Sequence, residues 1–275
     1  MTVSPAQRYQ MTWEQAVDWL RKQPDQALLV RACFFDDPLL DAARRYHAGP
    51  EWSAVRKLLP LSAGTALDVG AGRGIASYAL AADGWTVTAL EPDLSLLVGA
   101  GAIRTLAAES GLSITVIPDF GERMPFPNAS FELVHARQLL HHARDLDFLC
   151  RECCRVLKPG GTFIATREHV VDNESDLARF LGAHPLHHLY GGENAFPLSR
   201  YLRAISDAGI EITTILSPWE SDINLFPATL DDIRSSLAHR LGFPFPRLIP
   251  TRLVHWASRR LKAPGRLYTF AGRRP

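Results

Sequence analysis

One stretch, TALDVGAGRGIASYALAADGWTVTALEPD at residues 65–93, constrains the fold of this chain more than any other. It begins with an apolar run that ends at Val69 and passes directly into Gly70, Gly72 and Gly74. Glycine has no Cβ, so it can adopt a positive φ and lets a bound molecule approach the backbone closely. The run and the glycines together predict a strand that ends in a tight turn open to a ligand.

The second half of this stretch predicts a helix and a neighbouring strand. Residues 75–82 read as a helix, and its unpaired N–H groups and positive dipole end would face whatever lies over the turn. A second apolar run, 85–90, ends in Glu91. In a right-handed βαβ unit this acid lies beside the glycine turn, where a carboxylate can accept hydrogen bonds from two ribose hydroxyls. The pattern favours a nucleoside cofactor over a turn that needs glycine only for its own geometry.

The glycine spacing distinguishes between nucleoside cofactors. Dinucleotide sites use G-x-G-x-x-G/A, whereas here the third glycine comes one position earlier and Ile75 takes the later position. The stretch resembles motif I of the class I S-adenosylmethionine-dependent methyltransferases, a strand that ends in D/E-x-G-x-G-x-G. The resemblance implies S-adenosyl-L-methionine as methyl donor, S-adenosyl-L-homocysteine as product, and these cofactor-binding residues: Asp68, Gly70, Ala71, Gly72, Gly74, Glu91 and Pro92.

A third strand is expected at residues 113–117, and it ends at Asp119 and Phe120. Because its tip lies next along the same sheet edge, the acid can accept a hydrogen bond from an adenine amine there. The aromatic ring can lie against the base. We therefore include both residues in the cofactor site, although Asp-Phe in a loop would otherwise be unremarkable.

Three further blocks extend the resemblance over roughly residues 64–168. PFPNASFELV (125–134), ARQLLHH (136–142) and RECCRVLKPGG (151–161) are similar to blocks of small-molecule methyltransferases of the ubiquinone/menaquinone type. One departure is Glu132, where the family usually has Asp. The resemblance implies a small or medium-sized methyl acceptor, and it adds Ala136 and Arg137 to the cofactor site.

The regular alternation of strands and helices over residues 61–170 predicts a parallel sheet with helices on both faces. We expect an α/β, Rossmann-like, doubly wound sheet of seven strands; the resemblance implies the order 3-2-1-4-5-7-6 with strand seven antiparallel. Residues 1–60 read as a helical N-terminal cap, with helices at 12–21, from 37, and at 51–59, and residues 61–275 as the methyltransferase domain. The cap covers the cofactor cleft or docks another subunit.

An insertion at residues 169–197 follows the fifth strand, expected at 162–166. Open parallel sheets bind ligands at the carboxyl edge, so polar residues here are candidates for acceptor binding. His169, placed at the strand tip with an ordinary pKa near 6.5, is the first candidate base, and His142 is the second. The proposed substrate-binding residues are Arg167, Glu168, His188, Tyr190, Glu193 and Asn194. Plain loop roles and a metal site remain alternatives, and no metal is assigned.

A longer insertion, 217–265, separates strands expected at 210–216 and 266–271. Its length is typical of a lid or substrate-binding element. It contains a helix at 230–241 and a basic helix at 252–262, for which a solvated face is favoured over membrane or nucleic-acid contact.

Composition excludes several classes of protein. The net charge of +1 provides no global attraction to nucleic acid or membranes, and the N/D-P-P-Y/F motif of nucleic acid amine methylation is replaced by HARQ at 135–138. No apolar run reaches the ~18 residues of a membrane span, and MTVSPAQRYQ lacks a signal core. We expect a cytoplasmic protein with four free cysteines, three of them packed in one helix. The oligomeric state stays open.

These observations predict an S-adenosylmethionine-dependent methyltransferase that acts on the oxygen or nitrogen of a polar metabolite, saccharide or natural product. A module that binds the cofactor without chemistry is the alternative from another class. An NAD(P)-dependent oxidoreductase is disfavoured by the early third glycine.

Overall fold

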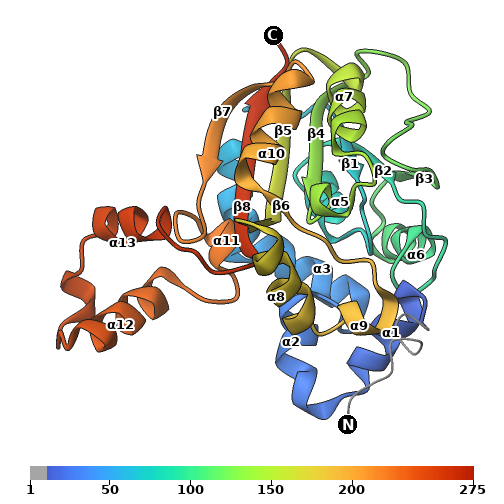
Figure 1. Ribbon diagram of the computed structural model, residues 1–275. Helices are drawn as coiled ribbons and strands as arrows, with labels where there is room; N and C mark the ends of the chain where they lie inside the picture. Colours follow the sequence, from blue (N-terminus) through green and yellow to red (C-terminus); the bar gives the residue numbers. More distant parts are fainter. Residues whose placement is uncertain (1–10) are drawn as a thin grey trace.

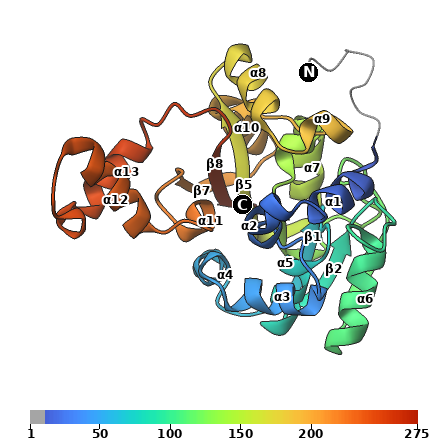
Figure 2. The same ribbon diagram turned by 90° about the horizontal axis from the view of Figure 1, so that it is seen from below.

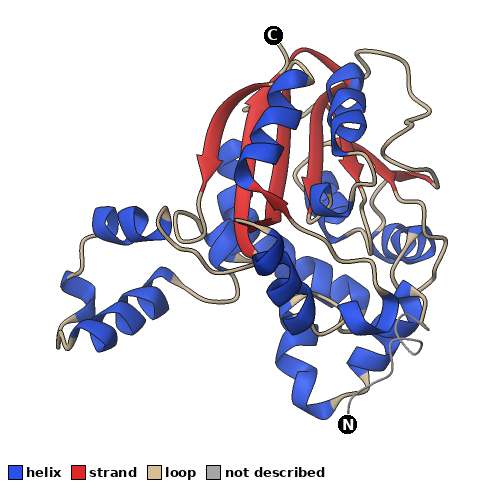
Figure 3. Ribbon diagram, in the orientation of Figure 1, coloured by secondary structure: helices blue, strands red, loops and turns tan. Residues whose placement is uncertain are grey.

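A single mixed sheet forms the centre of the molecule (Figures 1 and 3). The computed structural model describes residues 11–275. The N-terminal residues 1–10, in which we expect no export signal, therefore lie outside the described residues. The strand order is β3-β2-β1-β4-β5-β8-β7, and β8 runs antiparallel to both neighbours. This confirms the expected order, since β7 and β8 are the sixth and seventh major strands. The strands are β1 (Thr65–Val69), β2 (Thr86–Leu90), β3 (Ile114–Ile117), β4 (Phe131–Arg137), β5 (Leu157–Val171), the short β6 (Phe196–Pro197), β7 (Glu211–Leu216) and β8 (Arg266–Arg273).

Helices cover both faces of the sheet, and each face has its own apolar core. On one face α7 (Leu146–Val156) and α10 (Leu198–Asp207) pack against β4, β5 and β8. On the other face α5 (Ile75–Ala82) and α6 (Ala100–Ser110) pack together with α3 and α4 of the cap. Strands buried on both sides need apolar residues at successive positions, which is the pattern of β1 and β4. The doubly wound α/β fold is confirmed.

The three cysteines of α7 are core residues, as expected. Cys150, Cys153 and Cys154 are all buried, and burial raises the pKa of the Cys153 thiol well above its usual value. A protonated thiol is a poor nucleophile and metal ligand. Every cysteine of the chain is a free thiol.

The helical cap is α1 (Trp13–Arg21), α2 (Ala27–Ala32), α3 (Leu39–Ala48) and α4 (Pro50–Val55), with short 3-10 turns at Pro24–Gln26 and Arg56–Leu58. A capping box formed by Thr12 and Gln15 begins α1. The sequence pattern did not predict α2. Figure 1 shows α1, α2 and α3 gathered beyond the end of the sheet toward which β4 points.

Several strand and helix boundaries differ from the predicted ones. The fourth strand continues through Arg137, and β5 includes Lys158 through Gly161, which were predicted to end a helix. β5 also continues through residues 167–169, so these do not emerge from a strand tip. A bulge between Ala165 and Glu168, with Arg167 at φ 61°, interrupts its register with β8. Helix α6 begins at Ala100, after a turn at residues 96–98.

The first insertion folds back over the sheet end. It forms α8 (Glu174–Ala183) and α9 (His187–Tyr190) before β6 pairs with β5. The Met11 N–H donates to the Leu189 carbonyl at 3.1 Å, and the rings of Trp13 and Tyr190 lie 4.7 Å apart. The cap and this insertion therefore form one roof, which Figure 2 shows with α1 beside α9.

The second insertion divides into two parts with different positions. α11 (Asp222–Leu225) packs against α4, whereas α12 (Leu230–Leu241), a 3-10 turn (Pro246–Leu248) and α13 (Thr251–Ser258) form an arm that projects from the body (Figures 1 and 2). The arm has a small core of its own and is fastened by Ser217 Oγ to Ser258 Oγ at 2.6 Å. The expectation that the whole insertion roofs the sheet is therefore wrong for the arm. Among residues 11–275 no helix is long and apolar enough to cross a membrane.

Candidate cofactor and acceptor sites

The glycine turn has the geometry that the sequence predicts. Gly70, Gly72 and Gly74 have φ values of 63°, 54° and 82°, which disfavour any residue with a Cβ. A Cβ on Gly70 would lie 2.5 Å from the side chain of Leu139, so this glycine serves packing. A Cβ on Gly72 would meet nothing nearer than the Val98 carbonyl oxygen at 4.0 Å. The space above Gly72 is therefore open to a ligand.

Glu91 lies at the tip of β2 and is oriented toward this turn. Its Oε2 accepts the Gly72 N–H at 2.7 Å, and its Oε1 accepts the Asp93 N–H at 3.0 Å. The side chain is buried, and burial raises its pKa to about 7 despite these hydrogen bonds. The free lone pairs of a carboxylate held in this way suit the vicinal hydroxyls of a ribose.

Asp68 is an internal support of the turn. Its Oδ2 accepts from Ser77 Oγ at 2.6 Å, and its Oδ1 pairs with His135 Nδ1 at 2.9 Å. All three side chains are buried, and they join β1 to α5 and β4. The expectation that Asp68 itself binds the cofactor is therefore corrected, because its side chain is enclosed between β1, α5 and β4 and is only 1% exposed.

The residues after β3 are accessible, as an adenine site requires. Phe120 is 54% exposed, and its backbone N–H is accepted by Asp119 Oδ1 at 2.8 Å. The Arg144 guanidinium lies 5.8 Å from the Phe120 ring centroid. Asp119 Oδ2 and one face of the ring remain for a base. Of the other predicted cofactor residues, Ala71 and Pro92 are half-buried in the two loops, and Ala136 is buried in β4.

Two arginines predicted to bind ligands are instead structural. Arg137 forms a bidentate ion pair with the buried Glu51 of α4, at 2.7 and 3.1 Å. Arg167 donates to the carbonyls of Ile223 and Phe226 at 2.7 and 2.9 Å. Both side chains therefore fasten α4 and α11 to the sheet, and neither guanidinium is free for cofactor or acceptor.

A cluster of imidazoles and carboxylates lies where β4 and β5 approach the roof. We define the histidine–glutamate cluster as six buried or half-buried side chains and one exposed one: His141, His142, Glu168, His169, His184, Tyr190 and Glu193. Glu168 is fully buried and accepts the backbone N–H groups of Leu139 and His141 at 3.1 and 3.0 Å. The same carboxylate contacts His141 Nδ1 at 2.7 Å. Glu168 therefore positions His141 and does not face an acceptor.

Glu193 is the centre of this cluster. One of its oxygens, Oε1, accepts from the Tyr190 hydroxyl and lies 3.7 Å from His184 Nε2. The other, Oε2, lies 3.9 Å from Nε2 of both His141 and His142. Burial raises the pKa of Glu193, but the surrounding imidazoles and the hydroxyl lower it below its usual value.

His169 is not suited to be the base. Its Nδ1 contacts the Gly265 carbonyl at 2.8 Å, and its ring packs against His141 and Phe180. Burial and the neighbouring His141 lower its pKa to about 3, so the assumption of an ordinary pKa is wrong. His142 is exposed, and its Nδ1 contacts the Gly192 carbonyl at 2.9 Å. His188 is exposed and Asn194 half-buried.

Sequence reasoning missed His141 and the role of His184. The HH doublet at 141–142 was a usable signal, because adjacent residues in a 3-10 turn can both be directed at one carboxylate. His184 had no such signal, since its approach to Glu193 depends on how α8 and α9 pack. His135 and Ser77 were missed as partners of Asp68 for the same kind of reason.

The two sites are neighbours. Leu139 packs on Gly70 of the cofactor turn, and its backbone N–H is held by Glu168. Val98, whose carbonyl faces the space above Gly72, packs in one apolar cluster with Leu186 and the residues of α1. The cluster residues and the open turn therefore lie under the same roof.

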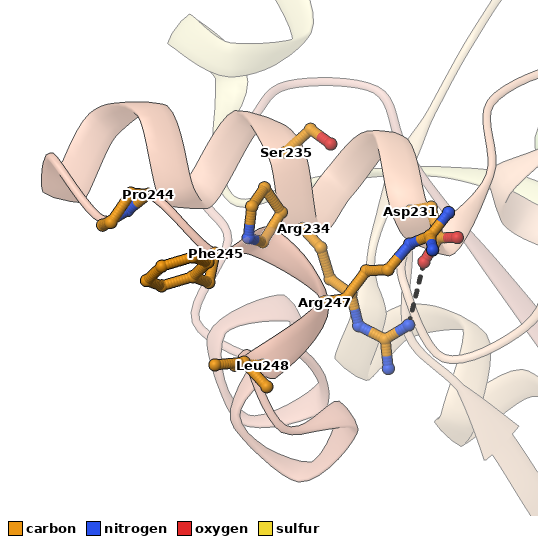
Figure 4. Close-up of a pocket in the computed structure, with 8 residues that line it drawn as sticks. Asp231, Arg234, Ser235, Pro244, Phe245, Arg247 and Leu248 are labelled. Atoms are coloured by element: carbon orange, nitrogen blue, oxygen red, sulfur yellow. Dashed lines mark hydrogen bonds and ion pairs between the residues drawn. The ribbon is translucent and has the colours of Figure 1, made fainter.

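A hollow of about 500 Å³ lies elsewhere, in the arm. Figure 4 shows it between α12 and the loop that follows, with the Arg234–Asp231 ion pair at 3.0 Å on one side. None of its lining residues belongs to the glycine turn or the histidine–glutamate cluster. A second hollow of about 400 Å³ adjoins the cluster, where Phe180 and His184 line it together with Pro264.

The doubly wound sheet, the glycine turn and the acid Glu91 beside that turn are together typical of a domain that binds a nucleoside cofactor. Residues 67–165 match the family model described as methyltransferase domain. Residues 67–165 therefore carry a methyltransferase domain, and the rest of the chain lies outside this match.

Known proteins similar to this chain include ubiquinone biosynthesis O-methyltransferases. The protein from Methylobacterium sp. (strain 4-46) is 33% identical over 129 residues, which are 46% of this chain and 47% of the relative. The one from Caulobacter vibrioides is 35% identical over 109 residues, 39% of this chain and 42% of the relative. The chain matches less than half the length of these two relatives.

Solved structures share the fold at low sequence identity. Geranyl diphosphate C-methyltransferase from Streptomyces coelicolor has a TM-score of 0.61 at 15% identity, over all of both chains. The [4+2]-cyclase SpnF has a TM-score of 0.56 at 22% identity, over 85% of this chain and 81% of that one. At these identities the likeness shows the fold alone.

Proposed function

We propose that this protein transfers a methyl group from S-adenosylmethionine to an oxygen or nitrogen of a small molecule. The proposal rests mainly on the position of Glu91. Its carboxylate accepts the backbone N–H of Gly72, and the space above Gly72 is open. The methyltransferase domain match over residues 67–165 supports it.

The cofactor residues fit the donor by their chemistry. Glu91 would accept hydrogen bonds from the ribose hydroxyls, Asp119 would accept from the adenine amine, and Phe120 would lie against the base. When bound, the donor supplies a methyl group on a cationic sulfur; the acceptor lone pair forms the new bond to carbon, and the pair of the broken C–S bond stays on sulfur. The protein's own part is alignment of the acceptor and exclusion of water.

The acceptor is proposed to lie against the histidine–glutamate cluster, on the side of His142. His142 is the exposed member, and Leu139 and Glu168 connect the cluster to the cofactor turn. The polar lining suits an acceptor with hydroxyl groups, such as a saccharide or a phenolic natural product. The free cysteines support our proposal that the protein works in the reducing cytoplasm.

The test is isothermal titration of the full chain with S-adenosylhomocysteine, NAD and NADP. We expect binding of S-adenosylhomocysteine alone, because the third glycine of the turn comes one position earlier than in the dinucleotide fingerprint. Absence of heat with S-adenosylhomocysteine would contradict the proposal. A chain that binds it but forms none from S-adenosylmethionine, with every polyhydroxylated or phenolic acceptor supplied, would be a binding module instead.

A further inference from the structure

We propose that His141, His142 and Glu193 form a binding site for one divalent transition metal ion, with Zn²⁺ as the ion of choice. The three residues come from two segments, the turn after β4 and the loop after α9. Their donor atoms all lie within 4.8 Å of one another. The metal site itself does not depend on the proposed methyl transfer.

The tautomers of both histidines direct a lone pair at the same carboxylate. His142 Nδ1 faces the Gly192 carbonyl oxygen, which can only accept, so Nδ1 carries the proton and Nε2 has the lone pair. His141 Nδ1 faces Glu168, whose oxygens already accept two backbone N–H groups, so Nδ1 is the donor here too. Both Nε2 atoms are therefore free ligands.

Glu193 is oriented to complete the set. The Tyr190 hydroxyl occupies its Oε1. His184 Nε2 lies 3.7 Å from the same oxygen, and His184 Nδ1 accepts the Leu186 N–H at 3.4 Å, so its Nε2 carries a proton and can donate. Only Oε2 is left, and it faces the two unprotonated Nε2 atoms at 3.9 Å each. When both imidazoles are neutral, these lone pairs repel the carboxylate, and a metal cation between them removes that repulsion.

The distances are close to those of a zinc site. Bonds of about 2.1 Å at tetrahedral angles put donor atoms about 3.4 Å apart. The contacts of Glu193 Oε2 to the imidazoles are about half an ångström longer. All three donor atoms lie within 4.8 Å of one another, so rotations of the exposed His142 and of the Glu193 side chain have to draw them together on metal binding.

The surroundings have the partners that metal ligands need. A metal-bound histidine usually donates its second ring N–H to a carboxylate or a carbonyl, which fixes the ring. Here Glu168 serves His141 and the Gly192 carbonyl serves His142. Two imidazoles with one carboxylate favour Zn²⁺ or Fe²⁺ over Mg²⁺, which prefers oxygen ligands.

Three protein ligands leave coordination positions open, as in catalytic zinc sites. If the proposed methyl transfer holds, an acceptor hydroxyl would occupy one of them. Zn²⁺ would lower the pKa of that hydroxyl, whose proton leaves to water before its oxygen forms the bond to the methyl carbon. The metal would then replace a histidine base.

The test is calorimetric titration of the chelator-treated, untagged full chain with ZnCl₂, together with metal analysis after dialysis. We expect one Zn²⁺ per chain and no competition by MgCl₂. Glu193→Gln and His142→Gln should each weaken zinc binding at least about a hundredfold, and Glu168→Gln by about ten- to a hundredfold. His239→Gln, which changes an exposed histidine of the arm, is the matched control and should bind as the parent does.

Unchanged zinc affinity in both Glu193→Gln and His142→Gln, or no stoichiometric zinc binding in the parent, overturns the site. Because His142 is exposed, its variant should fold even if Glu193→Gln does not, and circular dichroism checks this. Each variant is also titrated with S-adenosylhomocysteine. Zinc binding without S-adenosylhomocysteine binding would overturn the proposed function and leave the metal site standing, and the reverse result would overturn only the metal site.

Discussion

Two neighbouring sites at the carboxyl end of this sheet are built by different means: the cofactor edge, which is the glycine turn with Glu91, and the acceptor edge, which is the histidine–glutamate cluster where we propose that the acceptor binds. At the cofactor edge, backbone geometry makes the site: three glycines with positive φ, and one carboxylate held by two backbone N–H groups. At the acceptor edge, side chains from η4 (Leu140–His142), β5 and the roof meet around Glu193. A site that is formed by local backbone geometry tolerates few substitutions, and its residues lie close together in the sequence. A site made by packed side chains can change its chemistry without changing the fold.

The largest effect is expected at the cofactor edge, from substitution of Glu91. Glu91→Ala removes the acceptor of the ribose hydroxyls and of the Gly72 N–H, and charge-assisted hydrogen bonds contribute about 1.5–3 kcal/mol each. We expect the affinity for S-adenosylhomocysteine to fall about a hundredfold by calorimetry. Glu109→Ala, which removes an exposed acid of α6, should leave it unchanged. Equal affinities in the two variants would refute the ribose assignment.

At the acceptor edge the largest effect is expected on stability. Glu168→Ala leaves the buried N–H groups of Leu139 and His141 without an acceptor, and each such group costs about 1–3 kcal/mol. We expect the free energy of unfolding in urea to fall by about 2–4 kcal/mol. The affinity for S-adenosylhomocysteine should stay within about threefold, because Glu168 reaches the glycine turn only indirectly, through the backbone of Leu139.

Glu168→Gln is the matched control, since its amide oxygen still accepts a hydrogen bond and should restore part of the stability. A loss of cofactor affinity as large as that of Glu91→Ala would mean that the two edges are not separable.

The cofactor edge should also depend on pH. Burial raises the pKa of Glu91 to about 7, so the free protein carries a neutral Glu91 below that pH. A neutral carboxyl has lost part of its acceptor capacity, and binding must first remove its proton. The affinity for S-adenosylhomocysteine should therefore fall about tenfold from pH 8 to pH 6. Glu91→Gln has no such proton and should show a flat profile; a slope that persists in it would assign the titration to another group.

The sequence predicts the cofactor edge better than the acceptor edge, because local backbone geometry forms the first and side chains from distant elements form the second. The positions of the glycines and Glu91 were predictable because a βαβ unit of short, consecutive elements places them, and the strand order followed from the resemblance. Asp68 and Arg137 were assigned wrongly, since their partners His135 and Glu51 are placed by packing between elements that are distant in the sequence. Ser77, the other partner of Asp68, is placed by the packing of α5 on β1. His169 was misplaced because β5 continues past Thr166 through a bulge, which the apolar pattern does not encode.

The smallest effect is expected in the arm, which touches neither edge. Phe245 is 60% exposed and Leu248 68% exposed, and both line the hollow of Figure 4. Phe245→Ser with Leu248→Ser removes little buried apolar area, so surface substitutions of this kind change stability by about 0.5 kcal/mol or less. We expect unchanged affinities for S-adenosylhomocysteine and for Zn²⁺ in the double variant. A change in either affinity would show that the arm contacts the sheet end in solution. The arm would then have to be counted as part of one of the two sites.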